Sequence, residues 1–154
     1  MNMKKSVQTW LTRALNDPIT KTLSKNSHLT KIQLETLLID VLSDTVAGKP
    51  LKYDVKARLR LTKAQISRGS FNRTLEQAKN NVVKAIYTVL LLGYLGVFES
   101  TTLDPYLEIA NKLNRYMEAY RTMPNQGRLL KEQLEVMKMM REQLQTALKQ
   151  LSSP

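Results

Sequence analysis

Residues 70–98 read SFNRTLEQAKNNVVKAIYTVLLLGYLGVF, and this stretch decides how the chain folds. Its apolar residues recur at intervals of three and four, the period of one face of an α-helix. They are Phe71, Leu75, Ala78, Val82, Ile86, Val89 or Leu90, and Gly93. The pattern predicts one long helix or two nearly continuous ones. Its first half is polar on the outer side and is expected to project, whereas its second half is apolar nearly all round and is expected to be buried by other helices.

Two shorter helices are expected upstream. Residues 3–15 place apolar side chains at helical spacing, and the Asn-Asp-Pro sequence at 16–18 reads as a stop because proline disfavours helix at the residue before it. Residues 53–61 read as a short helix followed by a turn.

Residues 29–47 carry the strongest amphipathic pattern upstream. Their apolar positions are Ile32, Leu34, Leu37, Leu38, Val41, Leu42 and Val46. Thr30 is a candidate N-cap, although the acidic residue of a capping box comes five positions later, as Glu35, rather than three. Gly48 and Pro50 end the helix. The apolar face is that of a central core helix.

Downstream, an Asp-Pro pair at 104–105 resembles an N-cap followed by proline at the first helical position, and it starts a helix that reaches about residue 121. Met-Pro-Asn-Gln-Gly at 123–127 is the clearest linker. Residues 128–151 then form a helical pattern without Gly or Pro. The chain is therefore expected to be all-α, with a compact helical domain over 1–122, a linker, and a coiled-coil-like helix within 128–154.

The last helix has heptad-like spacing. Its seam consists of Leu130, Leu134, Met137, Leu144, Leu148 and Leu151, with Arg141 at the core position that the step of seven residues skips. Two interpretations stay open. The helix pairs with a second copy and makes a homodimer, or it folds back on residues 104–121 as an antiparallel hairpin.

The composition favours a polyanionic partner. The 154 residues contain 24 Lys and Arg against 13 Asp and Glu, a net charge of +11 with a pI near 10.0. Such an excess points first to nucleic acid, then to an anionic membrane surface or an acidic protein. The alternative interpretation of the charge is a basic surface that is only solvated and binds no partner.

The sequence gives little evidence for enzyme activity. There is no cysteine and a single histidine, His28, which excludes thiolate and multi-histidine metal sites. No phosphate-binding glycine loop and no carboxylate pair at a catalytic spacing is evident. We expect no enzyme activity and no cofactor or small-molecule substrate. The N-terminus lacks the features of a secretory signal and the most apolar run falls short of a membrane span, so a cytoplasmic protein is expected.

The positive charge is concentrated in one segment. Residues 49–84 contain ten basic residues opposed only by Asp54 and Glu76, so they hold +8 of the total +11. An indifferent surface would not concentrate charge in this way. This asymmetry is the most specific functional signal in the sequence.

Within this segment, cations, short hydrogen-bond donors and a helix start are the groups that contact phosphates, and Arg, Asn and Gln also reach base edges. The candidate nucleic-acid-binding residues are Lys56, Arg58, Arg60, Lys63, Ser67, Arg68, Ser70, Asn72, Arg73, Gln77 and Asn80. The alternative is a solvent-facing helix whose polar residues bind nothing.

Residues 66–75, ISRGSFNRTL, resemble the turn and recognition helix of helix-turn-helix DNA-binding proteins. The resemblance covers about residues 58–81 and implies that Ser67 caps the recognition helix and that Phe71 and Leu75 anchor it. It also implies that residues 68, 70, 72 and 73 face the major groove. Gly69 comes later than the family's turn glycine, and no β-wing follows. The whole chain is also similar to basic archaeal proteins, which implies no activity.

These observations favour a homodimeric double-stranded DNA-binding protein, either a transcription regulator or a nucleoid-associated protein. Two other functions remain open. One is an RNA- or ribosome-binding factor that uses the same basic face. The other is a protein-interaction adaptor that acts through the C-terminal helix.

Overall fold

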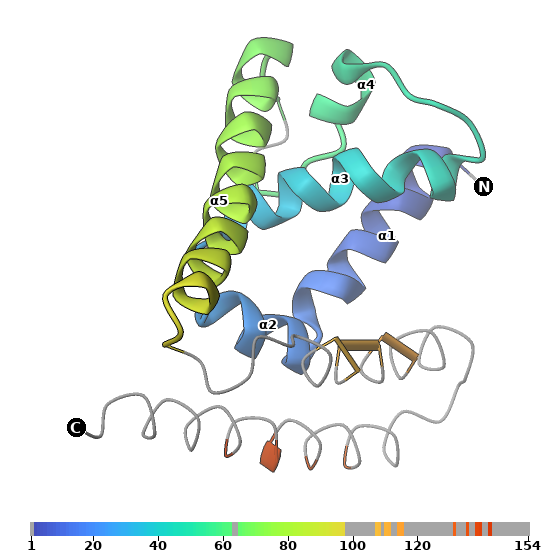
Figure 1. Cartoon of the computed structure of the whole chain (residues 1–154). Coiled ribbons are helices and arrows are strands. Elements are labelled where there is room, and N and C mark those ends of the chain that lie inside the picture. The colour runs from blue at the N-terminus through green and yellow to red at the C-terminus, as the bar shows by residue number, and fades with distance from the viewer. Residues whose placement is uncertain are drawn as a thin grey trace. The chain divides into compact units, whose positions relative to one another are not determined.

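The computed structural model describes residues 2–62 and 65–97 continuously, together with a few positions between 107 and 142. The protein is all-α, and every element of the described part is a helix (Figure 1). The chain divides into two compact units, residues 1–88 and 89–154. The linker expected at 123–127 and nearly all of the helices expected on either side of it lie outside the described residues.

Helix α1 spans Met3–Asn16 and α2 spans Pro18–Lys25. The predicted stop at 16–18 is confirmed, but a second helix begins there that the sequence analysis did not predict. Asp17 ends α1 and caps α2, since its Oδ2 accepts a hydrogen bond of 2.8 Å from the backbone N–H of Thr20. Pro18 takes the first helical position, where its missing N–H costs nothing. The sequence did contain a start signal for α2, because Asp17 and Pro18 form the same Asp-Pro pattern that predicts the helix start at 104–105.

Helix α3 spans Lys31–Ala47, close to the predicted 29–47. Thr30 caps it through a complete capping box whose third residue is Gln33 rather than an acid. The Thr30 hydroxyl accepts from the backbone N–H of Gln33 at 3.2 Å, and the Gln33 amide oxygen accepts from the backbone N–H of Thr30 at 3.1 Å. Gly48 ends the helix in the left-handed conformation, with φ of 69°.

Helix α4 spans only Tyr53–Ala57, so the expected helix over 53–61 is too long by a turn. Helix α5 spans Arg68–Tyr94, which is the first of the two alternatives expected for this stretch, one long helix rather than two nearly continuous ones. The Ser67 hydroxyl accepts a hydrogen bond of 3.1 Å from the backbone N–H of Ser70, which is the predicted cap.

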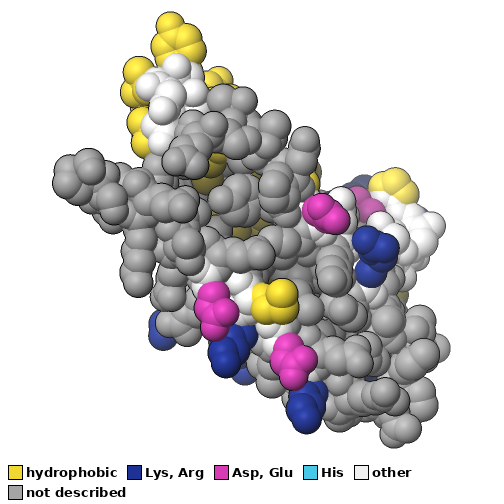
Figure 2. All heavy atoms as spheres, turned by 60° about the horizontal axis from the view of Figure 1, so that its bottom comes forward, with side chains coloured by type: hydrophobic (Ala, Val, Ile, Leu, Met, Phe, Trp, Pro, Cys, Tyr) yellow, Lys and Arg dark blue, Asp and Glu magenta, His cyan; other side chains and the backbone are white. Residues whose placement is uncertain are grey.

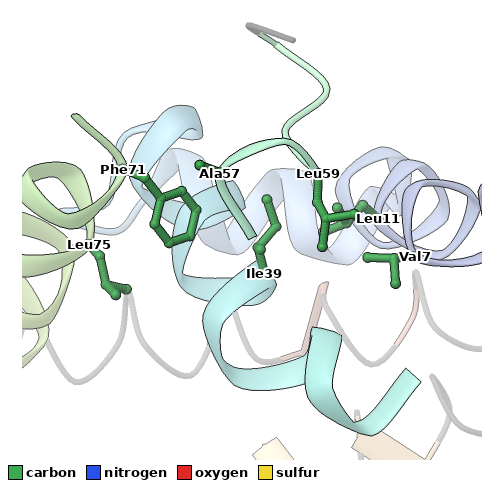
Figure 3. Close-up of a cluster of buried hydrophobic side chains, with 7 residues drawn as sticks. All are labelled: Val7, Leu11, Ile39, Ala57, Leu59, Phe71 and Leu75. Carbon is green, nitrogen blue, oxygen red and sulfur yellow. The ribbon is translucent and has the colours of Figure 1, made fainter. Parts of the chain in front are cut away.

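The core lies where α1, α3, α4 and the start of α5 meet. Helix α1 packs against α2 and α3, and α3 packs against α4. Figure 3 shows the buried cluster, which extends from Leu75 and Phe71 through Ile39 to Leu11 and Val7. It contains Val7, Leu11, Ile39, Ala57, Leu59, Phe71 and Leu75. The first half of α5 is thus anchored in the core through Phe71 and Leu75, as the helix-turn-helix resemblance implied, whereas its helical pattern predicted that it would project.

The face of α3 that points inward agrees only in part with the predicted apolar face. Its buried residues are Glu35, Thr36, Ile39 and Ser43, of which three are polar. Of the predicted apolar residues, Leu37, Leu38 and Val46 are half-buried and pack against the core cluster, whereas Ile32 and Val41 are exposed. Glu35 takes an inward position because its carboxylate accepts hydrogen bonds from the segment after α4.

The second half of α5 also differs from expectation. Burial along this helix ends at Ala78. Beyond it, Ile86, Tyr87 and Leu90 are more than half exposed, whereas the sequence predicted that other helices bury them. Hydrophobic side chains are accordingly visible at the surface in Figure 2. None of the helices in the described part of the chain combines the length and the hydropathy that a membrane span requires.

Candidate nucleic-acid interface

The first half of α5 separates an apolar face from a polar one. Phe71, Leu75 and Ala78 point into the core. The opposite side is solvent-exposed and contains most of the residues predicted to bind nucleic acid on this helix. The exposed candidates on α5 are Arg68, Ser70, Arg73, Gln77 and Asn80, and the candidates Arg58 and Ser67, which precede the helix, are exposed as well. Asn72 is half-buried, and its side-chain oxygen is turned inward.

Lys56 does not belong to this surface, although the sequence predicted it there. Its side chain is buried, and its Nζ lies 3.3 Å from Oδ1 of Asp40 and 3.1 Å from Oδ2 of Asp44. The same ammonium donates to the backbone oxygen of Asp40 at 3.0 Å and lies 5.5 Å from the centre of the Tyr53 ring. Lys56 therefore joins α4 to α3 and cannot reach a phosphate in this conformation.

Arg60 is also buried, with 3 % of its surface exposed. Its Nε lies 3.9 Å from Oε2 of Glu35, which is completely buried in α3. Charge burial on this scale requires a partner, and Glu35 supplies it. Arg60 is thus a structural residue, contrary to its predicted role in binding.

Glu35 does more than neutralise Arg60. One of its carboxylate oxygens accepts hydrogen bonds from the backbone N–H groups of Leu61 and Thr62, and the other accepts from the Thr62 hydroxyl at 2.6 Å. It therefore holds the chain that leads from α4 toward α5. Sequence reasoning treated Glu35 only as a misplaced capping acid and missed this function.

Three further contacts hold α5 against α3 and the residues just before it. The side-chain amide of Asn81 donates to the backbone oxygen of His28 at 3.3 Å and to Oε1 of Gln33 at 3.1 Å. Nζ of Lys79 lies 3.0 Å from Oδ2 of Asp40. These contacts lie on the side of the polar face nearest α3, so they fix the orientation of Arg73, Gln77 and Asn80 without using them.

The Lys56 cluster shifts the pKa values of its members. The hydrogen bond from the Leu51 backbone N–H, at 2.9 Å, and the charge of Lys56 hold the pKa of Asp44 below its ordinary 3.8, although burial raises it. Burial lowers the pKa of Lys56, but the hydrogen bonds and charges of Asp44 and Asp40 outweigh burial and raise the pKa above its ordinary 10.5.

The first half of the chain is therefore expected to lose stability at both pH extremes. Asp44 stabilises the fold fully above pH 3.8, and this contribution disappears as the pH falls through its lowered folded-state pKa. Lys56 contributes fully below pH 10.5, and its contribution disappears as the pH rises through its raised folded-state pKa. Thermal unfolding followed by circular dichroism between pH 2 and 7 measures how far the stability falls at acid pH. Asp44→Asn should make this fall smaller, whereas Asp54→Asn, at an exposed position on α4, should leave it unchanged.

The remaining candidate residues are not brought together by the described structure. Lys63 lies outside the described residues, as do all seven residues predicted for dimerisation: Leu130, Leu134, Met137, Arg141, Leu144, Leu148 and Leu151.

In the part of the chain that the structure describes, no three His, Asp or Glu side chains gather where they could hold a metal ion. No protein-family model, curated protein or solved structure matches this chain.

Proposed function

We propose that the protein binds double-stranded DNA through the exposed polar face of the first half of α5, as a transcription regulator or a nucleoid-associated protein. The observation that carries this proposal is the division of α5 into two faces. Phe71 and Leu75 are buried in the core, while Arg68 and Arg73 are exposed on the same turns of helix. A helix anchored in this way presents its polar side chains as a fixed array.

The chemistry of the array suits a major groove. Arginine forms bidentate hydrogen bonds with guanine O6 and N7, and Asn or Gln does so with adenine N6 and N7. Arg73, Gln77 and Asn80 recur at steps of four and three and therefore lie along one side of α5. In the proposed complex, Arg68 in the first turn contacts a phosphate.

The proposal assigns DNA recognition to α5 rather than to a helix pair. In a helix-turn-helix element, a turn of three or four residues joins the two helices. Here ten residues separate Ala57, the last of α4, from Arg68, the first of α5. The buried Glu35–Arg60 pair and the Glu35 hydrogen bonds replace a short turn as the device that positions the helix start.

Replacing Arg68 and Arg73 together by alanine is expected to weaken binding to a 25–30 bp duplex by at least about tenfold, since a lost arginine contact costs about 1–3 kcal/mol. The slope of log Kd against log salt should also fall by about 0.9 for each phosphate contact removed. Fluorescence anisotropy with a labelled duplex, at several salt concentrations, measures both quantities.

The matched control is Lys4→Ala with Lys5→Ala, which removes the same charge from exposed positions on α1. A general effect of net charge would make the two double variants equal. Unchanged binding by the Arg68/Arg73 variant would refute the proposed surface. Preference for a structured RNA over the duplex in direct competition would favour the RNA-binding function instead.

A further inference from the structure

The second half of α5 carries an exposed apolar seam. Val83, Tyr87, Leu90 and Tyr94 follow one another at steps of four, three and four, which is the spacing of the core positions of a coiled coil. All four are exposed, between 47 % for Val83 and 89 % for Tyr94. An apolar seam of this period fits a second helix lying alongside α5.

The seam is broad enough for a stable interface. It is flanked by Val82, Ile86, Leu91, Leu95 and Val97, which are all exposed. Two of the nine are tyrosines, a residue type that buries about 150–250 Å², and the other seven are smaller aliphatic residues, so an exposed apolar area of several hundred Å² results, comparable with the roughly 800 Å² per partner in a standard protein interface. The largest apolar patch on an ordinary monomer is about 300–600 Å².

The charge of the seam indicates which partner covers it. Residues 85–97 contain no charged residue, in a chain with a net charge of +11. Two copies of so basic a protein repel each other over most of their surface, and an uncharged seam is where that repulsion is weakest. A seam of this kind is also self-complementary, as the interface of a two-fold dimer must be.

We propose that two copies of the protein associate through the α5 seam of Val83, Tyr87, Leu90 and Tyr94. This interface differs from the C-terminal seam that the sequence predicted for dimerisation. The helical rise of 1.5 Å per residue places Tyr87 about 20 Å along α5 from Arg73. The pairing therefore leaves the polar face of the first half of α5 free in both copies, and the proposal does not rest on nucleic-acid binding.

Light scattering coupled to size-exclusion chromatography of the full chain tests the proposal. The wild type should have twice the monomer mass of 17.7 kDa, and Leu90→Glu with Tyr94→Glu should return it to one monomer mass with unchanged helical circular dichroism. The matched control, Leu134→Glu with Leu144→Glu in the C-terminal seam, should remain dimeric. A monomeric wild type, or a Leu90/Tyr94 variant that stays dimeric, overturns the proposal. A Leu90/Tyr94 variant that loses its helical signal also does so, because the seam is then covered within one chain.

The absence of cysteine allows a second, independent measurement. Leu90→Cys introduces the only thiol of the chain into the seam, whereas Thr88→Cys introduces one at an exposed position on another side of α5. With diamide as the oxidant, Leu90→Cys should form a disulfide-linked dimer at least about tenfold faster than Thr88→Cys. Equal rates would contradict pairing through the seam. Neither measurement involves DNA, so failure of this proposal is distinguishable from failure of the proposed function.

Discussion

Replacing Glu35 by alanine is expected to lower the free energy of unfolding by about 3–5 kcal/mol, because it leaves a buried charge without its partner. Glu35 is completely buried, and Arg60, the cation beside it, is nearly so. Among the described residues, Nε and Nη2 of Arg60 have no hydrogen-bond partner, so Glu35 is the main source of compensation for this guanidinium. The substitution also removes the acceptor for the Leu61 backbone N–H and for the Thr62 hydroxyl.

Urea unfolding followed by circular dichroism measures this loss. Glu76→Ala is the matched control, since Glu76 is exposed on α5, and it should change stability by less than about 0.5 kcal/mol. Adding Arg60→Met to Glu35→Ala should recover about 1–3 kcal/mol, because the second change removes the unpaired charge. If the double variant is no more stable than Glu35→Ala, the pair contributes little and the hydrogen bonds to residues 61–62 account for the effect.

The behaviour of Glu35 explains why the inward face of α3 was predicted only in part. Leucine and valine residues make up the strongest periodic pattern of this helix, and periodicity predicts that such a pattern is buried. The fully buried positions are Glu35, Thr36, Ile39 and Ser43, while Leu37, Leu38 and Val46 pack half-buried against the core. A polar residue such as Glu35 occupies an inward face when it satisfies groups on another segment, here the chain after α4. Local sequence patterns do not contain that partner, so they cannot predict the choice.

The same limit applies to the candidate site. Within residues 49–84, Lys56 and Arg60 look like any other cations, because only two acidic residues lie nearby in sequence. Their counter-charges, Glu35, Asp40 and Asp44, come from α3, outside that segment. A charge count along the chain therefore overestimates the basic surface. The face of α5 was predictable because helical periodicity alone separates residues 73, 77 and 80 from residues 71, 75 and 78.

The two halves of α5 show where hydrophobic periodicity stops being informative. It correctly predicted that the stretch is helical and that Phe71 and Leu75 lie on its apolar face. It also predicted burial for Tyr87 and Leu90, which are exposed. An apolar helix requires a cover, but the sequence does not tell whether the cover belongs to the same chain or to another one.

Replacing Phe71 by alanine is expected to lower the free energy of unfolding by about 3–5 kcal/mol, the usual cost of removing a buried aromatic ring and leaving a cavity. Phe71 is completely buried, and its ring centre lies 6.4 Å from that of Tyr53 at an angle of 48°. It ties the first turn of α5 to α4 and to the core that α1 and α3 share. Urea unfolding measures the loss, and Phe71→Leu, which keeps most of the apolar volume, should cost less.

Comparing Phe71→Ala with Arg73→Ala separates anchoring from binding, because the two residues are neighbours on opposite faces of α5. Arg73→Ala should change stability by less than about 0.5 kcal/mol, since Arg73 is exposed, and should weaken duplex binding. Phe71→Ala should weaken binding only to the extent that the folded fraction falls, and a stabilising osmolyte that restores folding should restore binding with it. Should Phe71→Ala remain fully folded and still lose binding, the aromatic ring itself contacts the nucleic acid and the anchored-helix explanation is wrong. Should Arg73→Ala destabilise the protein as much as Phe71→Ala, the polar face of α5 serves the fold rather than a partner.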